Sequence, residues 1–217
     1  MLEKAKVGKG NREWLHLARC ITKLWDPKTY LSLDLLINNQ PLRIIGVHLT
    51  SDRSAKSEQK RVVQLKDIAD RHVERSANLL VVGDFNYDDT EEDMHHVPAF
   101  SSATVDIWRQ IKPGDAGFTF DPKVNTMAQK TTIKNKQRRL DRIVMKRDSH
   151  LLKPITIEMI GSDPTTLPSG DIIFPSDHYG LQCDFELSKA PPPITPKANI
   201  PSNNNNSNHH QKDEVEE

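Results

Sequence analysis

Asp84 and Asn86 are the residues of this sequence whose types and spacing most suggest chemistry. They follow the apolar run 79–82 in the stretch Leu-Leu-Val-Val-Gly-Asp-Phe-Asn. A short apolar run of this kind is typical of a buried β-strand, and ligands of α/β proteins gather beyond the carboxyl ends of such strands. Because residues two apart on an extended chain point the same way, both side chains are expected to aim oxygen atoms into one space. Gly83 lets the backbone pass close to its neighbour.

Two other interpretations of this stretch must be weighed. In the first, Asp84 only closes an Asx turn after a strand, and the sequence leaves this alternative open. The second is a calcium-binding loop of the EF-hand type, since Asp84, Asn86 and Asp88 match its first three ligand positions. That pattern then fails, because the sixth position should be glycine and is Asp89, and the twelfth should be glutamate and is His95. The sequence therefore disfavours an EF-hand.

Three further fragments place polar side chains at the ends of predicted strands. Single members also have structural explanations: a lone histidine on a strand is often a hydrogen-bonded core residue, and a carboxylate beside an arginine is often an ion pair. The candidates are His48, near the end of a strand expected over residues 42–49, Asp141, beside Arg142 at the start of a strand expected over residues 140–145, and the adjacent pair Asp177 and His178.

In order along the chain, the fragments His-Leu-Thr-Ser, Gly-Asp-Phe-Asn, Arg-Leu-Asp-Arg-Ile and Ser-Asp-His resemble the endonuclease/exonuclease/phosphatase superfamily, which contains deoxyribonuclease I and the apurinic-site endonucleases. Residues 139–143 and 175–181 are most similar to its tyrosyl-DNA phosphodiesterase 2-like branch. The resemblance is clear over residues 48–187 and implies an α/β, deoxyribonuclease I-like fold. The chain would supply the second half of a four-layer sandwich, two facing sheets flanked by helices, and the N-terminal half is expected to be missing.

The same resemblance implies a role for each candidate. Asp84 would orient and deprotonate an attacking water, and Asn86 would hold a nonbridging phosphate oxygen. His178 would contact the phosphate as a cation, with Asp141 raising its pKa and fixing its orientation. His48 would be a second donor. The implied reaction is magnesium-dependent hydrolysis of a phosphodiester in nucleic acid by in-line attack of water, with 5′-tyrosyl-DNA as one candidate substrate.

Magnesium is the implied cofactor, with manganese as a substitute, and Asp177 would act in or near its coordination shell. In complete family members two earlier strands supply an Asn and then a Glu, which is the main protein ligand of the metal. No Gln-Glu pair occurs before His48. Three accounts follow: a fragment of an active enzyme, a catalytically inactive scaffold that binds phosphate or nucleic acid, or an interaction subunit whose missing half comes from another chain.

A basic run ahead of Asp141 is a candidate for contacts to phosphate that do not depend on base sequence, although a solvated loop explains it equally well. Residues 117–121 resemble the family segment that approaches the substrate. The candidate contacts to phosphate or nucleic acid are Asn125, Lys134, Lys136, Arg138 and Arg139.

The charge balance gives no field of the whole molecule that would favour nucleic acid or a membrane. The chain has 217 residues, with 30 Lys and Arg against 30 Asp and Glu, so any anion site must be local. No stretch approaches the roughly 20 apolar residues of a membrane span, and the first residues lack the apolar segment of a signal peptide. We expect an intracellular protein of the nucleus or cytoplasm with a phosphodiester substrate and no membrane partner. The sequence leaves its oligomeric state open.

Hydrophobic periodicity indicates the elements that must position these residues. A hairpin is expected over residues 30–49 and a helix over residues 54–75, which lead into the buried strand. Shorter amphipathic helices are expected over residues 14–24 and 100–111. A half-exposed strand over residues 181–187 is expected to close the sheet.

The domain boundaries follow from composition. Residues 1–29 are poorly assigned beyond the short helix. Residues 30–188 are expected to form the partial endonuclease/exonuclease/phosphatase domain. Residues 189–217 form a Pro- and Asn-rich tail with an acidic end, too poor in apolar side chains to fold.

Overall fold

The structure, a computed structural model, describes residues 16–22, 30–87, 97–132 and 135–188. Its elements in chain order are β1 (His16–Thr22), β2 (Leu31–Ile37), β3 (Gln40–His48), α1 (Ser57–Ile68), the π-helical turn η1 (Ala69–Val73), β4 (Leu79–Asp84), α2 (Pro98–Ser101), β5 (Thr104–Asp106), α3 (Ile107–Ile111), α4 (Thr126–Thr131), β6 (Asp141–Lys146), β7 (Leu152–Ile160), β8 (Thr165–Thr166), β9 (Ile172–Ile173) and β10 (Gly180–Leu187).

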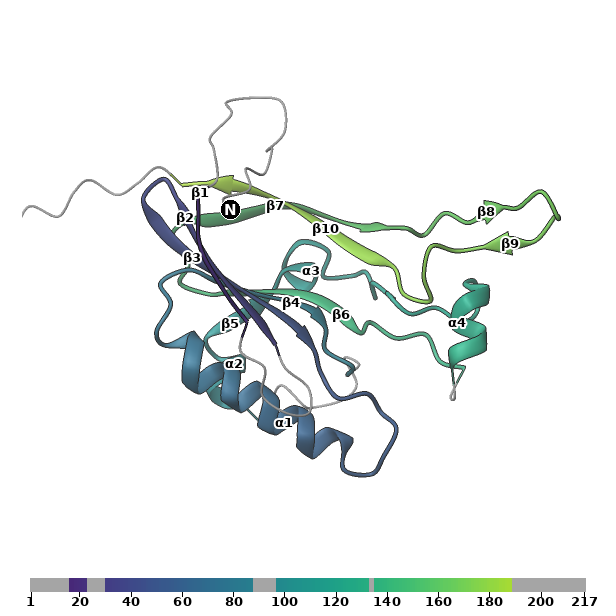
Figure 1. Cartoon of the computed structure of the whole chain (residues 1–217), viewed down its shortest axis with the longest axis horizontal. Helices are drawn as coiled ribbons and strands as arrows, with labels where there is room; N and C mark the ends of the chain where they lie inside the picture. Colours follow the sequence, from purple (N-terminus) through teal and green to yellow (C-terminus); the bar gives the residue numbers. More distant parts are fainter. Residues whose placement is uncertain (1–15, 23–29, 88–96, 133–134, 189–217) are drawn as a thin grey trace, which may run out of the picture.

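A six-stranded sheet forms the centre of the described chain, with its strands in the order β1-β2-β3-β4-β6-β5 (Figure 1). β3 and β4 run parallel, and the other neighbouring pairs in this sheet are antiparallel. The predicted hairpin is confirmed as β2 and β3, joined by Asn38 and Asn39 with φ angles of 50° and 61°. Two such residues make the primed turn that suits the twist of a hairpin.

The predicted long helix is confirmed as α1 and η1, which connect the parallel strands β3 and β4. They cover one face of the sheet together with α2, while β7, β10 and α3 lie over the other face (Figure 1). Side chains alternate along β4, so Leu79 and Val81 join the helix-side core, and Leu80 and Val82 join the opposite one. The predicted buried strand is therefore confirmed.

The last strand does not close the main sheet, contrary to expectation. β10 pairs antiparallel with β7 in a separate two-stranded sheet that packs against the six-stranded one. β8 and β9 form a further small hairpin that projects from the body (Figure 1). The structure confirms the mixed α/β class, and the four-layer arrangement with a missing first half stays an expectation.

Two predicted helices are wrong. Residues 16–22 form the strand β1 rather than a helix, because they pair antiparallel with β2, a tertiary contact that local periodicity does not reveal. The helix predicted over residues 100–111 is split into α2, β5 and α3. The β-branched Thr104 and Val105 pair with β6, and Asp106 then caps α3 by accepting the backbone N–H of Arg109.

In the described part of the chain, no helix combines the length and the apolar character needed to cross a bilayer. The tail predicted over residues 189–217 lies outside the described residues.

Gly83 is predicted to be required for the fold. Its φ angle is 126°, and a Cβ added there would lie 2.1 Å from the carbonyl oxygen of Val47 on β3. Gly83→Ala should therefore lower the free energy of unfolding by about 3 kcal/mol, measured by urea denaturation. Gly114→Ala is the matched control, because its added Cβ meets no atom within 4 Å. Equal stability of the two variants would contradict the close approach of β3 and β4.

Candidate active site

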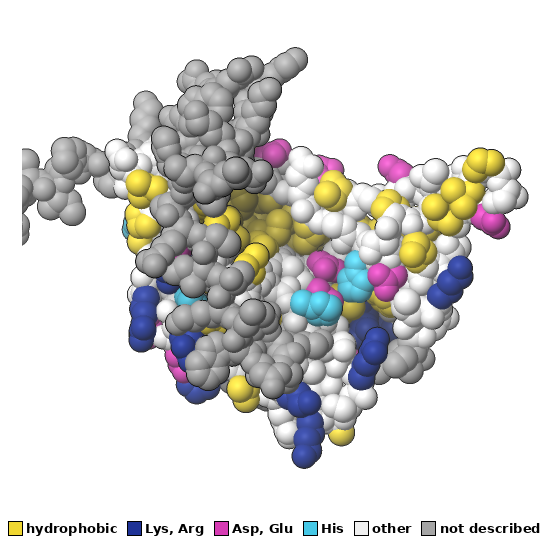
Figure 2. All heavy atoms as spheres, viewed as in Figure 1, with side chains coloured by type: hydrophobic (Ala, Val, Ile, Leu, Met, Phe, Trp, Pro, Cys, Tyr) yellow, Lys and Arg dark blue, Asp and Glu magenta, His cyan; other side chains and the backbone are white. Residues whose placement is uncertain are grey.

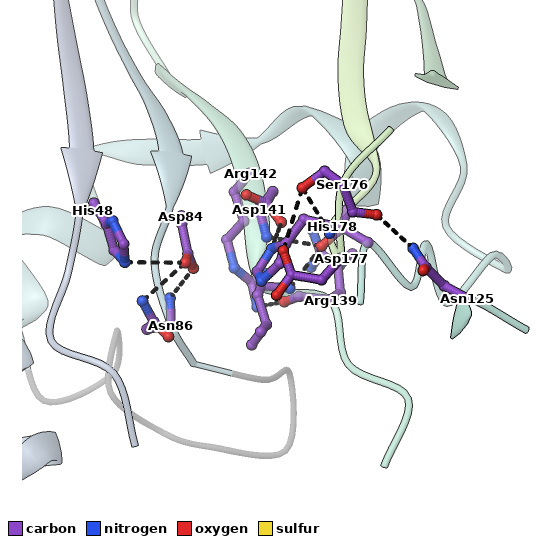
Figure 3. A network of polar contacts seen from close by, with 12 residues as sticks. His48, Asp84, Asn86, Asn125, Arg139, Asp141, Arg142, Ser176, Asp177 and His178 are labelled. Atoms are coloured by element: carbon purple, nitrogen blue, oxygen red, sulfur yellow. Dashed lines mark hydrogen bonds and ion pairs between the residues drawn. The ribbon is translucent and has the colours of Figure 1, made fainter. Parts of the chain in front are cut away.

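The ends of three neighbouring strands bring three of the predicted site residues into a row. His48 on β3 is in register with Asp84 on β4, and Asp84 is in register with Asp141 on β6. The Nε2 atom of His48 lies 3.5 Å from a carboxylate oxygen of Asp84, and the His48 side chain is largely exposed. Figure 3 shows this row at the end of the sheet.

The turn after β4 fixes the carboxylate of Asp84. The backbone N–H of Asn86 donates to Asp84 Oδ1 at 2.8 Å, which is the Asx turn that the sequence left open. The Asn86 side-chain amide donates from Nδ2 to the Asp84 carboxylate and to the carbonyl of Leu49, each at 2.9 Å. The Asx turn and a functional site are therefore compatible interpretations of this stretch, because the turn orients the carboxylate of Asp84.

Asp141 and His178 form a hydrogen-bonded pair on the other side of Asp84. Nδ1 of His178 lies 2.7 Å from Asp141 Oδ2, and the ring of Phe120 packs against the imidazole with 5.2 Å between centroids. Burial disfavours the charged imidazole, but the hydrogen bond with Asp141 and the charges of Asp141, Asp84 and Asp177 outweigh it and raise the pKa of His178.

Asp84 lies in an environment that disfavours its charge. Burial, followed by repulsion from Asp141, raises the pKa of Asp84 above the ordinary 3.8. His178, the backbone N–H of Asn86 and His48 act in the opposite direction and lower the pKa of Asp84. Asp84 is therefore stabilised by His48 and Asn86 on one side, and by His178, the partner of Asp141, on the other.

All five residues predicted as catalytic line one open cleft of about 790 Å³. Figure 2 shows histidine and acidic side chains gathered in this hollow, with basic side chains near it. The other lining residues are Ser51, Asp52, Arg53, Phe120, Thr131, Thr132, Arg138, Leu140 and Asp177.

The cleft offers donors for a divalent cation. One ligand atom each of Asp84, Asp141 and His178 lies within 4.8 Å of the others. Carboxylate oxygens are the donors that Mg²⁺ and Mn²⁺ prefer, so the two aspartates fit a hard cation. Asp177, the expected metal residue, is not in this cluster, but it lines the same cleft and accepts a hydrogen bond from the Thr131 hydroxyl at 3.0 Å.

Asn125 and Arg139 are corrections to the predicted contact surface. Asn125 is 0% exposed: its Oδ1 accepts the backbone N–H groups of Met127 and Ala128, and its Nδ2 donates to the carbonyl of Ser176. Arg139 is 1% exposed and pairs with Asp106. Both side chains are buried by these contacts, so neither is presented to a phosphate in this structure.

The remaining basic candidates differ in position. Arg138 lines the cleft, 3.8 Å from the carboxylate of Asp52 and over the ring of Phe120. Lys136 is exposed and is not among the residues that line the cleft. Lys134 lies outside the described residues. A phosphate contact by Arg138 is therefore the one that the geometry favours.

A buried ion network lies beneath the cleft, and the sequence pattern did not predict it. Asp106 accepts from Arg139 at 2.7 Å and from Arg142 at 2.9 Å, so Arg142 pairs with Asp106 while Asp141 pairs with His178. Arg142 also donates to the carbonyl of Tyr87, which ties β6 to the turn after Asp84. Arg139 and Arg142, at the start of β6, would each need an acidic partner if buried. The neighbouring sequence does not identify Asp106, which is 33 and 36 residues away.

Comparisons with known proteins give a family match and several relatives. The profile of the endonuclease/exonuclease/phosphatase family matches residues 3–178. Relatives include tyrosyl-DNA phosphodiesterase 2 of Xenopus laevis, 26% identical over 171 residues, and of Gallus gallus, 30% identical over 173 residues. Each alignment covers 74% of this chain, but 43% and 44% of the relatives, so the chain spans less than half of their length.

Solved structures show a similar fold. TDP2 of D. rerio, complexed with single-strand DNA product, matches with a TM-score of 0.64 at 20% identity over 86% of this chain and 76% of that chain. Truncated TDP2 of Caenorhabditis elegans matches with a TM-score of 0.62 at 18% identity over 85% of this chain and 75% of that chain.

The pair Asp141 and His178 predicts a pH-dependent stability. Because the folded-state pKa of His178 is raised above 6.5, the pair stabilises the fold fully below that pH and loses its contribution as the pH rises through the raised pKa. In metal-free buffer, Asp141→Asn should lower the free energy of unfolding by about 1.5 kcal/mol near pH 6, and by much less near pH 9. Urea denaturation at both pH values measures this.

The same substitution in a His178→Gln background is the control, and there the pH dependence should vanish. A loss that grows with pH would contradict the pairing.

Proposed function

The chain belongs to the endonuclease/exonuclease/phosphatase family, and from this premise we propose that it is a metal-dependent phosphodiester hydrolase acting on nucleic acid. The observation that carries the proposal is the row of His48, Asp84 and Asp141 with His178 in one cleft. It joins an oriented carboxylate to a cationic histidine, the two groups that water activation and phosphate binding require.

In this mechanism Asp84 orients a water and accepts its proton. The two hydrogen bonds from Asn86 hold the carboxylate in place, and its raised pKa makes it a better proton acceptor than an exposed aspartate. Because both Nδ2 hydrogens of Asn86 are used within the protein, its proposed contact to a nonbridging oxygen requires one of these bonds to be exchanged.

His178 binds the phosphate as a cation. Asp141 holds the Nδ1 side of the ring, so the Nε2 side is left to donate toward the substrate. His48, largely exposed at the end of β3, is placed to donate to a second phosphoryl oxygen. A cationic His178 would compensate part of the charge that an anionic substrate brings next to two carboxylates, and His48 would add a hydrogen-bond donor.

A divalent cation completes the proposed site. Mg²⁺, or Mn²⁺ in its place, would bind in this acidic cleft with Asp177 in or near its shell, while Asp84 stays available as the proton acceptor. When bound, such a cation stabilises negative charge on the phosphoryl and leaving oxygens.

The proposed substrate is a single-stranded DNA end, with a 5′-tyrosyl adduct as the specific candidate. Three observations support it: the names of the sequence relatives, the DNA product in the D. rerio structure, and Arg138 in the wall of the cleft. An arginine there provides a phosphate contact that does not depend on base sequence.

The second candidate function is binding of nucleic acid without hydrolysis. It is favoured by one observation: in the described ranges, the cluster of candidate metal ligands consists of two aspartates and a histidine and contains no glutamate, the residue that complete family members are expected to use. Turnover separates this candidate from the first.

Asp84→Asn is predicted to reduce kcat/KM for a 5′-tyrosyl oligonucleotide by about 1000-fold, since a general base contributes on this scale. A chelator should abolish wild-type activity and added Mg²⁺ should restore it. The variant should be folded and no less stable than the wild type at neutral pH. In the wild type, burial and repulsion from Asp141 raise the pKa of Asp84, so the ionised carboxylate carries a cost in the folded state that the Asn variant does not have.

Full activity of Asp84→Asn, or of the wild type in chelator, would refute the proposed hydrolysis. A wild-type protein that binds the oligonucleotide with a steep salt dependence and no turnover would support the second candidate instead.

Arg138→Ala is predicted to weaken binding of single-stranded DNA and to reduce the slope of log K against log salt by about 0.7, the value for one phosphate contact. Lys136→Ala is the matched control, because Lys136 belongs to the same basic run but is exposed outside the cleft. Fluorescence anisotropy over a salt series measures both. Equal slopes for the two variants would exclude Arg138 as a contact.

A further inference from the structure

Thr119 is a fully buried residue, 0% exposed, between α3 and α4. Its side chain and its backbone contact the two segments that carry Asp141 and His178. None of the roles described above uses it, because it does not line the cleft.

The Thr119 hydroxyl is bonded to the start of β6. Its Oγ1 accepts the backbone N–H groups of Leu140 and Asp141, each at 3.0 Å. A hydroxyl oxygen has two lone pairs, so these two bonds use its full capacity as an acceptor. One side-chain atom therefore holds the backbone that presents the Asp141 carboxylate, in addition to the pairing of β6 with β4.

The Thr119 carbonyl is bonded to the segment after His178. It accepts the backbone N–H of Tyr179 at 2.7 Å. Since His178 in turn contacts Asp141 at 2.7 Å, the contacts close a ring that runs from Thr119 to Asp141, across to His178, along one peptide to Tyr179 and back.

The residues after Thr119 strengthen the same connection. Phe120 and Arg138 exchange two backbone hydrogen bonds, at 2.9 and 3.0 Å, and the Phe120 ring packs on His178. Asn125 donates to the carbonyl of Ser176, two residues before His178. The segment from Thr119 to Asn125 therefore bridges the two sides of the site.

We propose that Thr119 is a positioning residue that sets the separation and orientation of Asp141 and His178 through this ring of hydrogen bonds. The catalytic meaning of the inference rests on the proposed function, while the positioning itself does not. β6 belongs to the six-stranded sheet and β10 to the two-stranded one, so without Thr119 the pair would span two sheets that share no backbone hydrogen bond among the described strands.

The experiment uses three substitutions at Thr119 in the full chain. Thr119→Val keeps the shape and removes the acceptor, Thr119→Ser keeps the acceptor, and Thr119→Ala removes the acceptor without placing a methyl group against the two N–H groups. Thr126→Val is the matched control, because the Thr126 hydroxyl donates to the carbonyl of Ile172 and contacts neither member of the pair.

The first readout is the proton NMR signal of the His178 Nδ1–H in metal-free protein, which a short bond to a carboxylate shifts to low field. Thr119→Val should lose or move this signal, while Thr119→Ser and Thr126→Val should keep it. A folded Thr119→Val with an unchanged signal overturns the inference. If that variant does not fold, Thr119→Ala decides in the same way.

The second readout is kinetic. Thr119→Val should lower kcat by about 100-fold with little change in KM, as expected for a misplaced catalytic pair, and Thr119→Ser should restore it. Unchanged kcat in Thr119→Val overturns the catalytic part of the inference. If the wild type shows no turnover, the proposed function fails, but the NMR readout still tests the positioning.

Discussion

The site depends on the repulsion between two carboxylates on neighbouring strands. The register of β4 and β6 places Asp84 opposite Asp141, and their repulsion, added to burial, raises the pKa of Asp84. The groups around them each supply positive charge or a hydrogen-bond donor: His178, His48 and the amide groups of Asn86. A phosphate would add a further negative charge. An anionic substrate therefore fits here only together with protonated histidine or a divalent cation, which is why we propose both.

The two walls of the cleft are held by different forces. One wall is the end of the six-stranded sheet, where β3 and β4 approach so closely at Gly83 that only a glycine fits. Beneath it, Asp106 binds Arg139 and Arg142, and Arg142 reaches the carbonyl of Tyr87. The other wall, made by α4 and the segment that carries His178, is joined to the first by hydrogen bonds of single residues. Asp84 is thus fixed by the fold, and His178 by a few polar contacts.

The sequence predicted the parts of the site that obey local rules. Apolar runs that end in polar residues identified His48 and Asp84, and a polar residue at the start of a strand identified Asp141. The structure brings the three together because they lie at neighbouring strand ends. The positions of the basic side chains depend on contacts with residues that are distant in sequence. Arg139 looked like a surface cation, but it is buried against Asp106, 33 residues away in sequence. The edge position of β1 likewise depends on pairing with β2, so its periodicity alone suggested a helix.

The unequal support of the two walls has a consequence for how the site responds to its surroundings. β10 begins just after His178 and pairs with β7 in a sheet of two strands, an arrangement of marginal stability by itself. Its inward side chains, Leu181, Cys183 and Phe185 among them, are only partly buried against the core, whereas Asp84 lies on a strand buried on both faces. Ordering of the side of β7 and β10 would therefore affect the position of His178 more directly than that of Asp84. The half of the site for which we propose phosphate binding is held by few contacts, and the half for which we propose water activation is part of the six-stranded sheet.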